Sequence, residues 1–130
     1  MAVLADTIAD AVNRFTVSHN DIVAVYVFGS VATGRSRAAS DLDLAIMSRR
    51  QISGDERIAY ETELSNTLGR DVDLVVFGQS GALLQHQILK NGKLVFESDF
   101  GERVRQEVMA RAEYLDTRFL YQALRDSNHG

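Results

Sequence analysis

The chain has 130 residues, of which 45% are hydrophobic and 25% charged, and this composition predicts a single globular domain and argues against disorder. The formal net charge of −4 comes without a basic stripe of the kind that grips long nucleic acid, so we expect no direct binding to long nucleic acid. The chain has no cysteine and no apolar run near the roughly 20 residues of a membrane span, so we exclude disulfides, thiolate metal sites and membrane insertion and expect a cytoplasmic protein.

The first predicted elements are an amphipathic helix and a buried strand. The apolar residues that share one face of the helix are Leu4, Ile8, Ala11, Val12 and Phe15. Residues 22–28 then form a nearly unbroken apolar run of residues common in strands, which is typical of a central strand. This run ends at Gly29.

A glycine-serine pair follows the strand and predicts a phosphate contact. After a strand, Gly29-Ser30 opens a helix whose free N–H groups and positive dipole end can receive a phosphate. We expect Ser30 Oγ and nearby backbone N–H groups to contact the β- or γ-phosphate of a nucleotide, with Gly29 allowing close approach. Both residues also have structural roles, because Gly29 ends a strand and Ser30 begins a short helix or turn over residues 30–37.

Two carboxylates at alternate positions begin the next predicted strand, over residues 42–47. Asp41 and Asp43 project from the same face, and no neighbouring lysine compensates their charge. They therefore repel one another and attract a divalent cation. The alternative is a pair of solvated acids at a strand end, which we disfavour because aspartate is rare in strands.

A third carboxylate follows the next helix. Ser53-x-x-Glu56 is a capping box and Gly69 a helix stop, so a helix is expected between them, before a strand that carries Asp73. Asp71 has the same strand parity and remains an alternative, but the apolar run after Asp73 places that residue inside the strand. Three acids from two strands can hold two Mg²⁺ ions, and we expect Asp41, Asp43 and Asp73 to be both metal ligands and catalytic residues.

The remaining elements are a helix capped by Ser80 and ended by Asn91-Gly92, a short strand over residues 93–96, and a long helix over about 99–126. One stripe of the long helix has the spacing of a face packed on the domain: Val104, Val108, Ala112, Leu115 and Phe119. A second apolar group lies elsewhere around the helix and is expected to contact another partner: Tyr114, Leu120, Tyr121 and Leu124. The predicted fold class is α/β (α+β), a small mixed sheet flanked by helices with a long C-terminal helix.

The order Gly29-Ser30-x-x-x-Gly34, then Ser40-Asp41-x-Asp43-Leu44, then Asp73 resembles the signature of the DNA polymerase β-like nucleotidyltransferases. The resemblance is closest to their minimal branch, the MNT domains, which are usually antitoxin partners of helical HEPN toxins. It implies a palm-like fold and a nucleotide site that includes Gly34 and Ser40.

Arginines surround the acidic motif. Arg35, Arg37, Arg49 and Arg50 form a local group that is better sized for a triphosphate than for a duplex. Arg35 and Arg37 are candidate phosphate contacts, although arginines in such positions are more often solvated surface residues than ligands.

The resemblance implies transfer of AMP from ATP, with Mg²⁺, to a tyrosine of a cognate HEPN toxin, whose RNase activity is thereby blocked, as in a type VII-like toxin–antitoxin system. The long helix is then expected to contact the toxin or a second copy of this chain. Two alternatives remain. A non-catalytic antitoxin would have no need of the four residues Ser30, Asp41, Asp43 and Asp73, and a small-molecule nucleotidyltransferase would be expected to have an extra domain for its acceptor.

Overall fold

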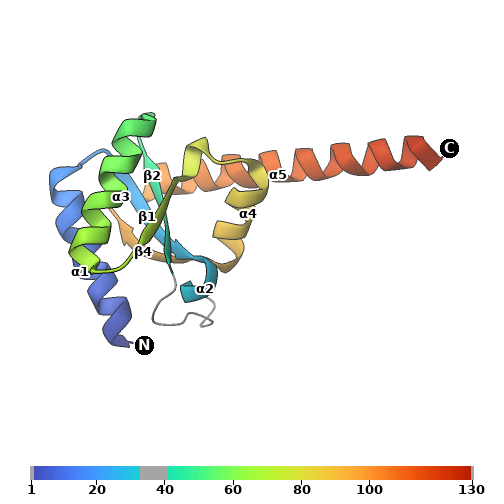
Figure 1. Cartoon of the computed structure of the whole chain (residues 1–130). Helices are drawn as coiled ribbons and strands as arrows, with labels where there is room; N and C mark the ends of the chain where they lie inside the picture. Colours follow the sequence, from blue (N-terminus) through green and yellow to red (C-terminus); the bar gives the residue numbers. More distant parts are fainter. Residues whose placement is uncertain (1, 33–40, 130) are drawn as a thin grey trace.

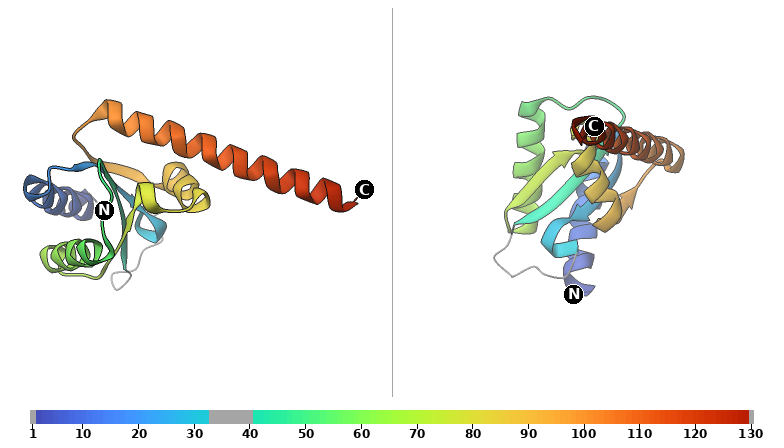
Figure 2. Two further views of the ribbon diagram at one scale, coloured as in Figure 1. Left: turned by 90° about the horizontal axis from the view of Figure 1, so that it is seen from above. Right: turned by 90° about the vertical axis from the view of Figure 1, so that its right-hand side faces the viewer.

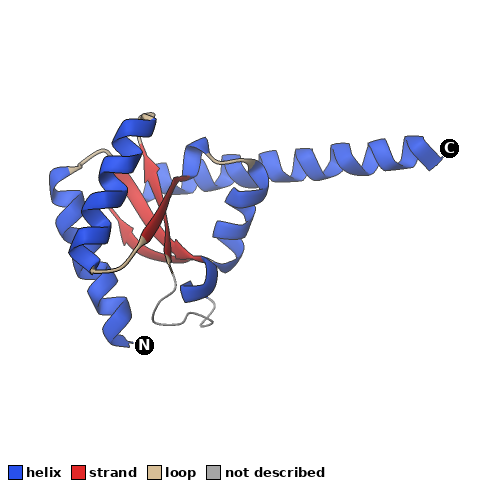
Figure 3. Ribbon diagram, in the orientation of Figure 1, coloured by secondary structure: helices blue, strands red, loops and turns tan. Residues whose placement is uncertain are grey.

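A four-stranded mixed sheet with the strand order β3-β2-β1-β4 forms the centre of the protein (Figures 1 and 3). The computed structural model describes residues 2–32 and 41–129. The strands are β1 (Ile22–Phe28), β2 (Leu42–Ser48), β3 (Val72–Val76) and β4 (Lys93–Glu97), and the helices are α1 (Ala2–Ser18), α2 (Gly29–Ala32), α3 (Gly54–Leu68), the 3₁₀ turn η1 (Phe77–Gln79), α4 (Ala82–Asn91) and α5 (Phe100–His129). β1 is antiparallel to β2 and β4, whereas β2 and β3 are parallel. The predicted α/β fold class is confirmed.

Helices cover both faces of the sheet, α1 and α3 on one side and α4 and α5 on the other (Figure 2). Val25 and Val27 of β1 are buried against the α1/α3 side. Ala24 and Tyr26 belong to the opposite core, together with Ile88 of α4. From Ala24 to Val27, alternation along β1 therefore sends successive side chains to opposite cores.

The predicted ends of α3 are confirmed by its caps. Ser53 Oγ accepts a hydrogen bond from Glu56 N, and the Glu56 side chain accepts one from Ser53 N, which completes the capping box. Gly69 ends the helix in the left-handed region with φ 66°. The predicted cap of α4 is wrong: Gly81 is its N-cap, because Ser80 Oγ instead donates to Val76 O.

Side chains of α3 also cover the outer edge of β3. Val72 N donates to Ser65 Oγ at 3.0 Å, and Leu74 N donates to Glu61 Oε2 at 2.8 Å. Arg57 Nη1 donates to Leu74 O at 3.2 Å. These bonds satisfy backbone groups that an edge strand would otherwise offer to another strand.

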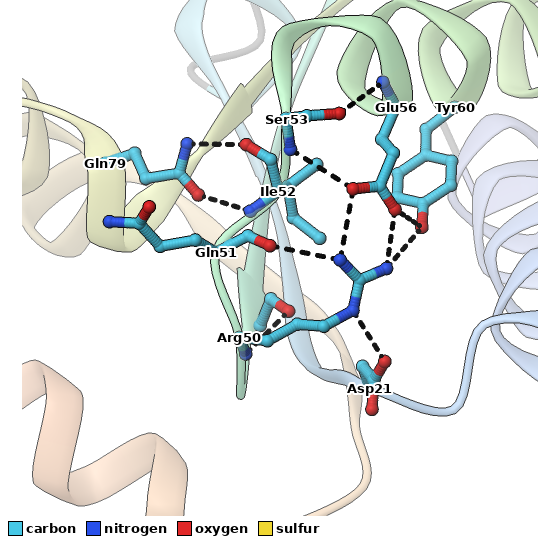
Figure 4. A network of polar contacts seen from close by, with 9 residues as sticks. Asp21, Arg50, Gln51, Ile52, Ser53, Glu56, Tyr60 and Gln79 are labelled. Atoms are coloured by element: carbon cyan, nitrogen blue, oxygen red, sulfur yellow. Dashed lines mark hydrogen bonds and ion pairs between the residues drawn. The ribbon is translucent and has the colours of Figure 1, made fainter.

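Arg49 and Arg50 lie at the end of β2 that is remote from Asp43, where they form ion pairs. Arg50 Nη2 is 2.6 Å from Glu56 Oε2 and Arg50 Nε is 2.8 Å from Asp21 (Figure 4). Arg49 pairs with Asp99 at 2.7 Å. Because β2 separates them from the acidic motif, the expectation that these two arginines belong to a triphosphate site is wrong.

The predicted packing of α5 is also wrong. Val108, Leu115 and Phe119 are 58%, 59% and 76% exposed. The face that meets the sheet carries a polar network instead, in which Tyr26 Oη donates to Glu107 Oε2 at 2.5 Å and Arg103 Nη1 lies 2.7 Å from the same oxygen.

One member of the second apolar group of α5 also packs within the domain. The Tyr114 ring stacks on His86 with 3.8 Å between the ring centroids. Leu120, Tyr121 and Leu124 stay exposed on the part of α5 that extends away from the other elements (Figure 2). In the described part of the chain, no helix is both long and apolar enough to cross a membrane.

Candidate active site

The candidate carboxylates meet at one end of the sheet, where β1 finishes and β2 and β3 begin. Asp43 is the register partner of Phe28 on one side and of Asp73 on the other. Adjacent strands lie roughly 4.8 Å apart, so Asp43 and Asp73 are direct neighbours on one face. That face is the α4/α5 side, because Ala45 and Val75 have the same parity and pack there.

Gly29 lies directly against this acidic pair. Its φ of 71° is in the left-handed region, which favours glycine. A Cβ atom at this position would overlap the carboxylate of Asp43. The absence of a Cβ at Gly29 therefore leaves room for the Asp43 side chain, and the close approach of a phosphate to Gly29 stays a prediction.

Asp43 has a raised pKa because of its surroundings. Burial raises its pKa, and the negative charges of Asp73 and then Asp41 raise it further. Among the residues that the structure describes, no lysine or arginine forms an ion pair with any of these three acids. A cation bound between them would relieve that repulsion.

The side chains alone do not form a complete metal cage. Within residues 2–32 and 41–129, no group of three or more His, Asp or Glu residues is arranged to hold a metal ion. Mg²⁺ is commonly bound through one or two carboxylates together with phosphates of the substrate and water. The Asp43 and Asp73 pair fits that mode of binding, in which the nucleotide supplies the remaining ligands.

Asp71 and Asp73 have different surroundings. Both residues are exposed. The backbone carbonyl of Asp71 accepts a hydrogen bond from Leu42 N at 2.9 Å. Asp73 lines an open hollow of about 370 Å³ at the edge of β3, together with Arg57 and Ser80. Sequence reasoning did not single out Arg57, whose only local signal is its i,i+4 pairing with Glu61.

Several residues that the sequence predicts to contact the nucleotide are not among those that the structure describes. Gly34, Arg35, Arg37 and Ser40 lie outside the described residues. Ser30 belongs to α2, and its proposed phosphate contact stays a prediction.

The fold and this acidic sheet end define a nucleotidyltransferase domain. Residues 10–101 match the family described as Polymerase beta, Nucleotidyltransferase, and the chain belongs to that family.

A curated relative is the protein adenylyltransferase MntA of Shewanella oneidensis, which is 30% identical over 69 residues. The match covers 53% of this chain and 50% of MntA, so the matched stretch spans about half the length of that relative.

Two solved structures share the fold over almost their whole length. A toxin–antitoxin crystal structure with AMP-PNP has a TM-score of 0.80 and 21% identity, covering 94% of this chain and 98% of the other. An MNT antitoxin in complex with the tri-AMPylated Shewanella oneidensis HEPN toxin has a TM-score of 0.75 and 19% identity, covering 97% and 99% of the two chains. At these identities the likeness establishes the nucleotidyltransferase fold.

Proposed function

We propose that this protein is a Mg²⁺-dependent nucleotidyltransferase that transfers AMP from ATP to a tyrosine hydroxyl of a cognate HEPN toxin, and so acts as its antitoxin. Family membership supports nucleotidyl transfer. The adenylyltransferase name of the MntA relative supports AMP as the transferred group. The fold shared with an MNT antitoxin bound to an AMPylated toxin supports the partner.

The observation that carries the proposal is the pairing of Asp43 with Asp73 beside Gly29. Two aspartates from parallel strands lie side by side on one face of the sheet, and the glycine leaves room for the Asp43 side chain. Among the residues that the structure describes, these acids belong to neither core and form no ion pair, which leaves them available for a cation and its nucleotide.

Asp41 and Asp43 would bind Mg²⁺ next to the triphosphate of ATP. Asp73 would bind Mg²⁺ next to the attacking hydroxyl of the acceptor. When bound, Mg²⁺ neutralises the phosphate charges and makes the α-phosphorus a better electrophile. Gly29 and Ser30 would position the phosphates at the start of α2.

Asp73 would also help to deprotonate the acceptor hydroxyl. The hydroxyl oxygen forms a bond to the α-phosphorus while the bond to the bridging oxygen breaks. Pyrophosphate leaves, and the hydroxyl proton passes toward Asp73. The hollow beside Asp73 and Arg57 provides an approach for the acceptor.

We assign the toxin contact to α5, over about residues 99–126. Its outer part exposes Phe119, Leu120, Tyr121 and Leu124. Aromatic side chains of this kind often dominate the binding energy of protein interfaces. A second copy of this chain is the alternative occupant, and the size of the purified protein distinguishes the two.

Calorimetry tests the cation requirement. ATP should bind with Mg²⁺ or Mn²⁺ and lose its measurable affinity in EDTA, because the bare carboxylates repel a triphosphate. Asp116→Asn, on the outer part of α5, is a control that should not change binding. Equal ATP affinity in EDTA would contradict the proposed site.

A further inference from the structure

A second cavity lies at the opposite end of the sheet from the acidic pair. It is open to solvent, has a volume of about 280 Å³ and is lined by the end of β2, η1, α4 and α5. Its wall includes Ser48, Phe77, Gln85, Gln106, Met109 and Glu113. Ser48 is five residues beyond Asp43 along β2, which places the cavity roughly 17 Å from the acidic pair. It is therefore separate from the nucleotide site.

Three arginines are part of the cavity wall, and each is already paired with a carboxylate. Arg49 is 2.7 Å from Asp99, and Arg50 pairs with Asp21 and Glu56. Arg105 Nη2 is 2.6 Å from Glu102, and its Nε also donates to that carboxylate. Because each guanidinium has its own carboxylate, the cavity offers little attraction to an anion.

Three groups in the wall can accept a hydrogen bond from an incoming donor. Gln85 is only 6% exposed, and its Nε2 donates to Phe77 O at 2.8 Å, which fixes the orientation of its amide. Its Oε1 is buried without a hydrogen-bond partner in the structure. A buried unsatisfied acceptor is costly, and a donor that enters the cavity would remove that cost.

Two further acceptors lie in the same wall. Gln106 Nε2 donates to Ser48 O at 3.1 Å, which leaves the carbonyl oxygen of that amide as an acceptor facing Gly78. Glu113 is exposed, and its side chain forms no ion pair or hydrogen bond with any residue that the structure describes. The cavity thus combines a carboxylate and two amide oxygens with the apolar surfaces of Phe77 and Met109.

This chemistry matches a cationic group on an apolar stem. A volume of about 280 Å³ is below the range common for drug-sized ligands, so the cavity suits one long side chain better than a nucleotide. We propose that the cavity receives a lysine or arginine side chain of the protein that docks along α5. The partner itself rests on the proposed function, whereas the acceptors and the cavity do not.

The position of the cavity supports a protein side chain as the occupant. Met109 and Glu113 belong to α5, and Leu120 and Leu124 follow on the same side of that helix, seven and eleven residues after Glu113. A partner that covers these exposed leucines would pass the cavity mouth.

Nuclear magnetic resonance on the full chain tests the inference with defined probes. The cationic probes are Nα-acetyl-lysinamide and Nα-acetyl-argininamide, and Nα-acetyl-norleucinamide is the neutral match of the lysine probe. We expect the cationic probes to shift the side-chain amide signals of Gln85 and Gln106 and the methyl signal of Met109 in a saturable way. Glu113→Gln should weaken this binding about fivefold, and Asp116→Asn, a neighbouring exposed acid on α5, should leave it unchanged.

Equal binding of the norleucine probe, or equal effects of the two substitutions, would overturn the inference. Spermidine that binds at least about tenfold more tightly than either amino-acid probe would assign the cavity to a free polyamine and would also overturn it. ATP titration of the same samples separates the two proposals. Normal Mg²⁺-dependent ATP binding without cation binding removes only this inference, whereas cation binding without ATP binding removes the nucleotidyltransferase proposal.

Discussion

Asp43 and Asp73 are register partners on the parallel strands β2 and β3, and both side chains point to the α4/α5 face of the sheet. This relationship places two like charges side by side next to Gly29. A protein gains no stability from such an arrangement, so the pair is best understood through the cation and nucleotide that it would bind.

Asp43→Asn should stabilise the metal-free protein at neutral pH by up to about 1 kcal/mol, because it removes the like-charge repulsion. The raised pKa of Asp43 in the folded state makes wild-type stability fall as the pH rises from the ordinary aspartate range through the folded-state pKa. The gain should therefore disappear at a pH low enough to protonate the carboxyl in both states. Urea unfolding in EDTA at several pH values measures it, and a loss of stability at neutral pH would assign Asp43 a structural role.

Gly29→Ala should destabilise the fold by about 2 kcal/mol or more, because the new methyl group would add an overlap with Asp43 to the cost of positive φ. Gly69→Ala is the matched control: its φ is 66°, and no atom lies within 4 Å of the added Cβ. That variant should lose only about 1 kcal/mol. Thermal unfolding of both proteins gives the comparison, and equal losses would show that the contact with Asp43 is unimportant.

The caps and strand parities could be predicted from the sequence because they depend on local chemistry. Ser53, Glu56 and Gly69 act through hydrogen bonds and backbone angles within one helix, and the parity of Asp43 and Asp73 follows from strand alternation. The position of Asp73 next to Asp43 also depends on the register of β2 and β3, which cannot be read from the sequence spacing.

The face of α5 that packs on the sheet could not be predicted from the sequence. Hydrophobic periodicity detects apolar faces, whereas this face contacts the sheet through hydrogen bonds of Glu107 with Tyr26 and Arg103. The apolar stripe of the helix therefore predicts the wrong packed face. Arg49 was misplaced for a different reason. Arg49 is close to Asp43 in the sequence, but a strand extends by about 3.3 Å per residue, so the two residues lie far apart in space.

Tyr26→Phe should cost about 2 kcal/mol at neutral pH, because it removes the phenol that donates to the buried carboxylate of Glu107. Burial alone would raise the pKa of Glu107, but the hydrogen bonds from Tyr26 and Arg103 outweigh it and hold that pKa below its ordinary value. The stabilisation is therefore present above the ordinary glutamate range and is lost as the pH falls through the folded-state pKa. Chemical unfolding as a function of pH measures both effects.

Tyr60→Phe is a control for the loss of a phenol, since its bond to Glu56 is 3.4 Å long and should contribute little. If the two variants lose the same stability, the Tyr26–Glu107 bond is not what fastens α5 to the sheet.

Tyr121→Ala combined with Leu124→Ala should weaken the complex with the HEPN partner by about 2 kcal/mol or more, while ATP binding and stability stay near wild type. Both side chains are exposed on the outer part of α5, so their removal leaves no cavity in the domain. Co-purification and size-exclusion chromatography report the result. An unchanged complex, with an unchanged size for the protein alone, would place the interface elsewhere.

The most direct test of the central claim follows the labelled phosphate. The protein is incubated with its HEPN partner, Mg²⁺ and ATP labelled at either the α- or the γ-phosphate, alongside Asp73→Asn. Nucleotidyl transfer predicts that label from the α-phosphate appears on a partner tyrosine, that label from the γ-phosphate does not, and that Asp73→Asn transfers neither. Transfer of the γ-label, or full α-label transfer by Asp73→Asn, would contradict an active site built on Asp41, Asp43 and Asp73.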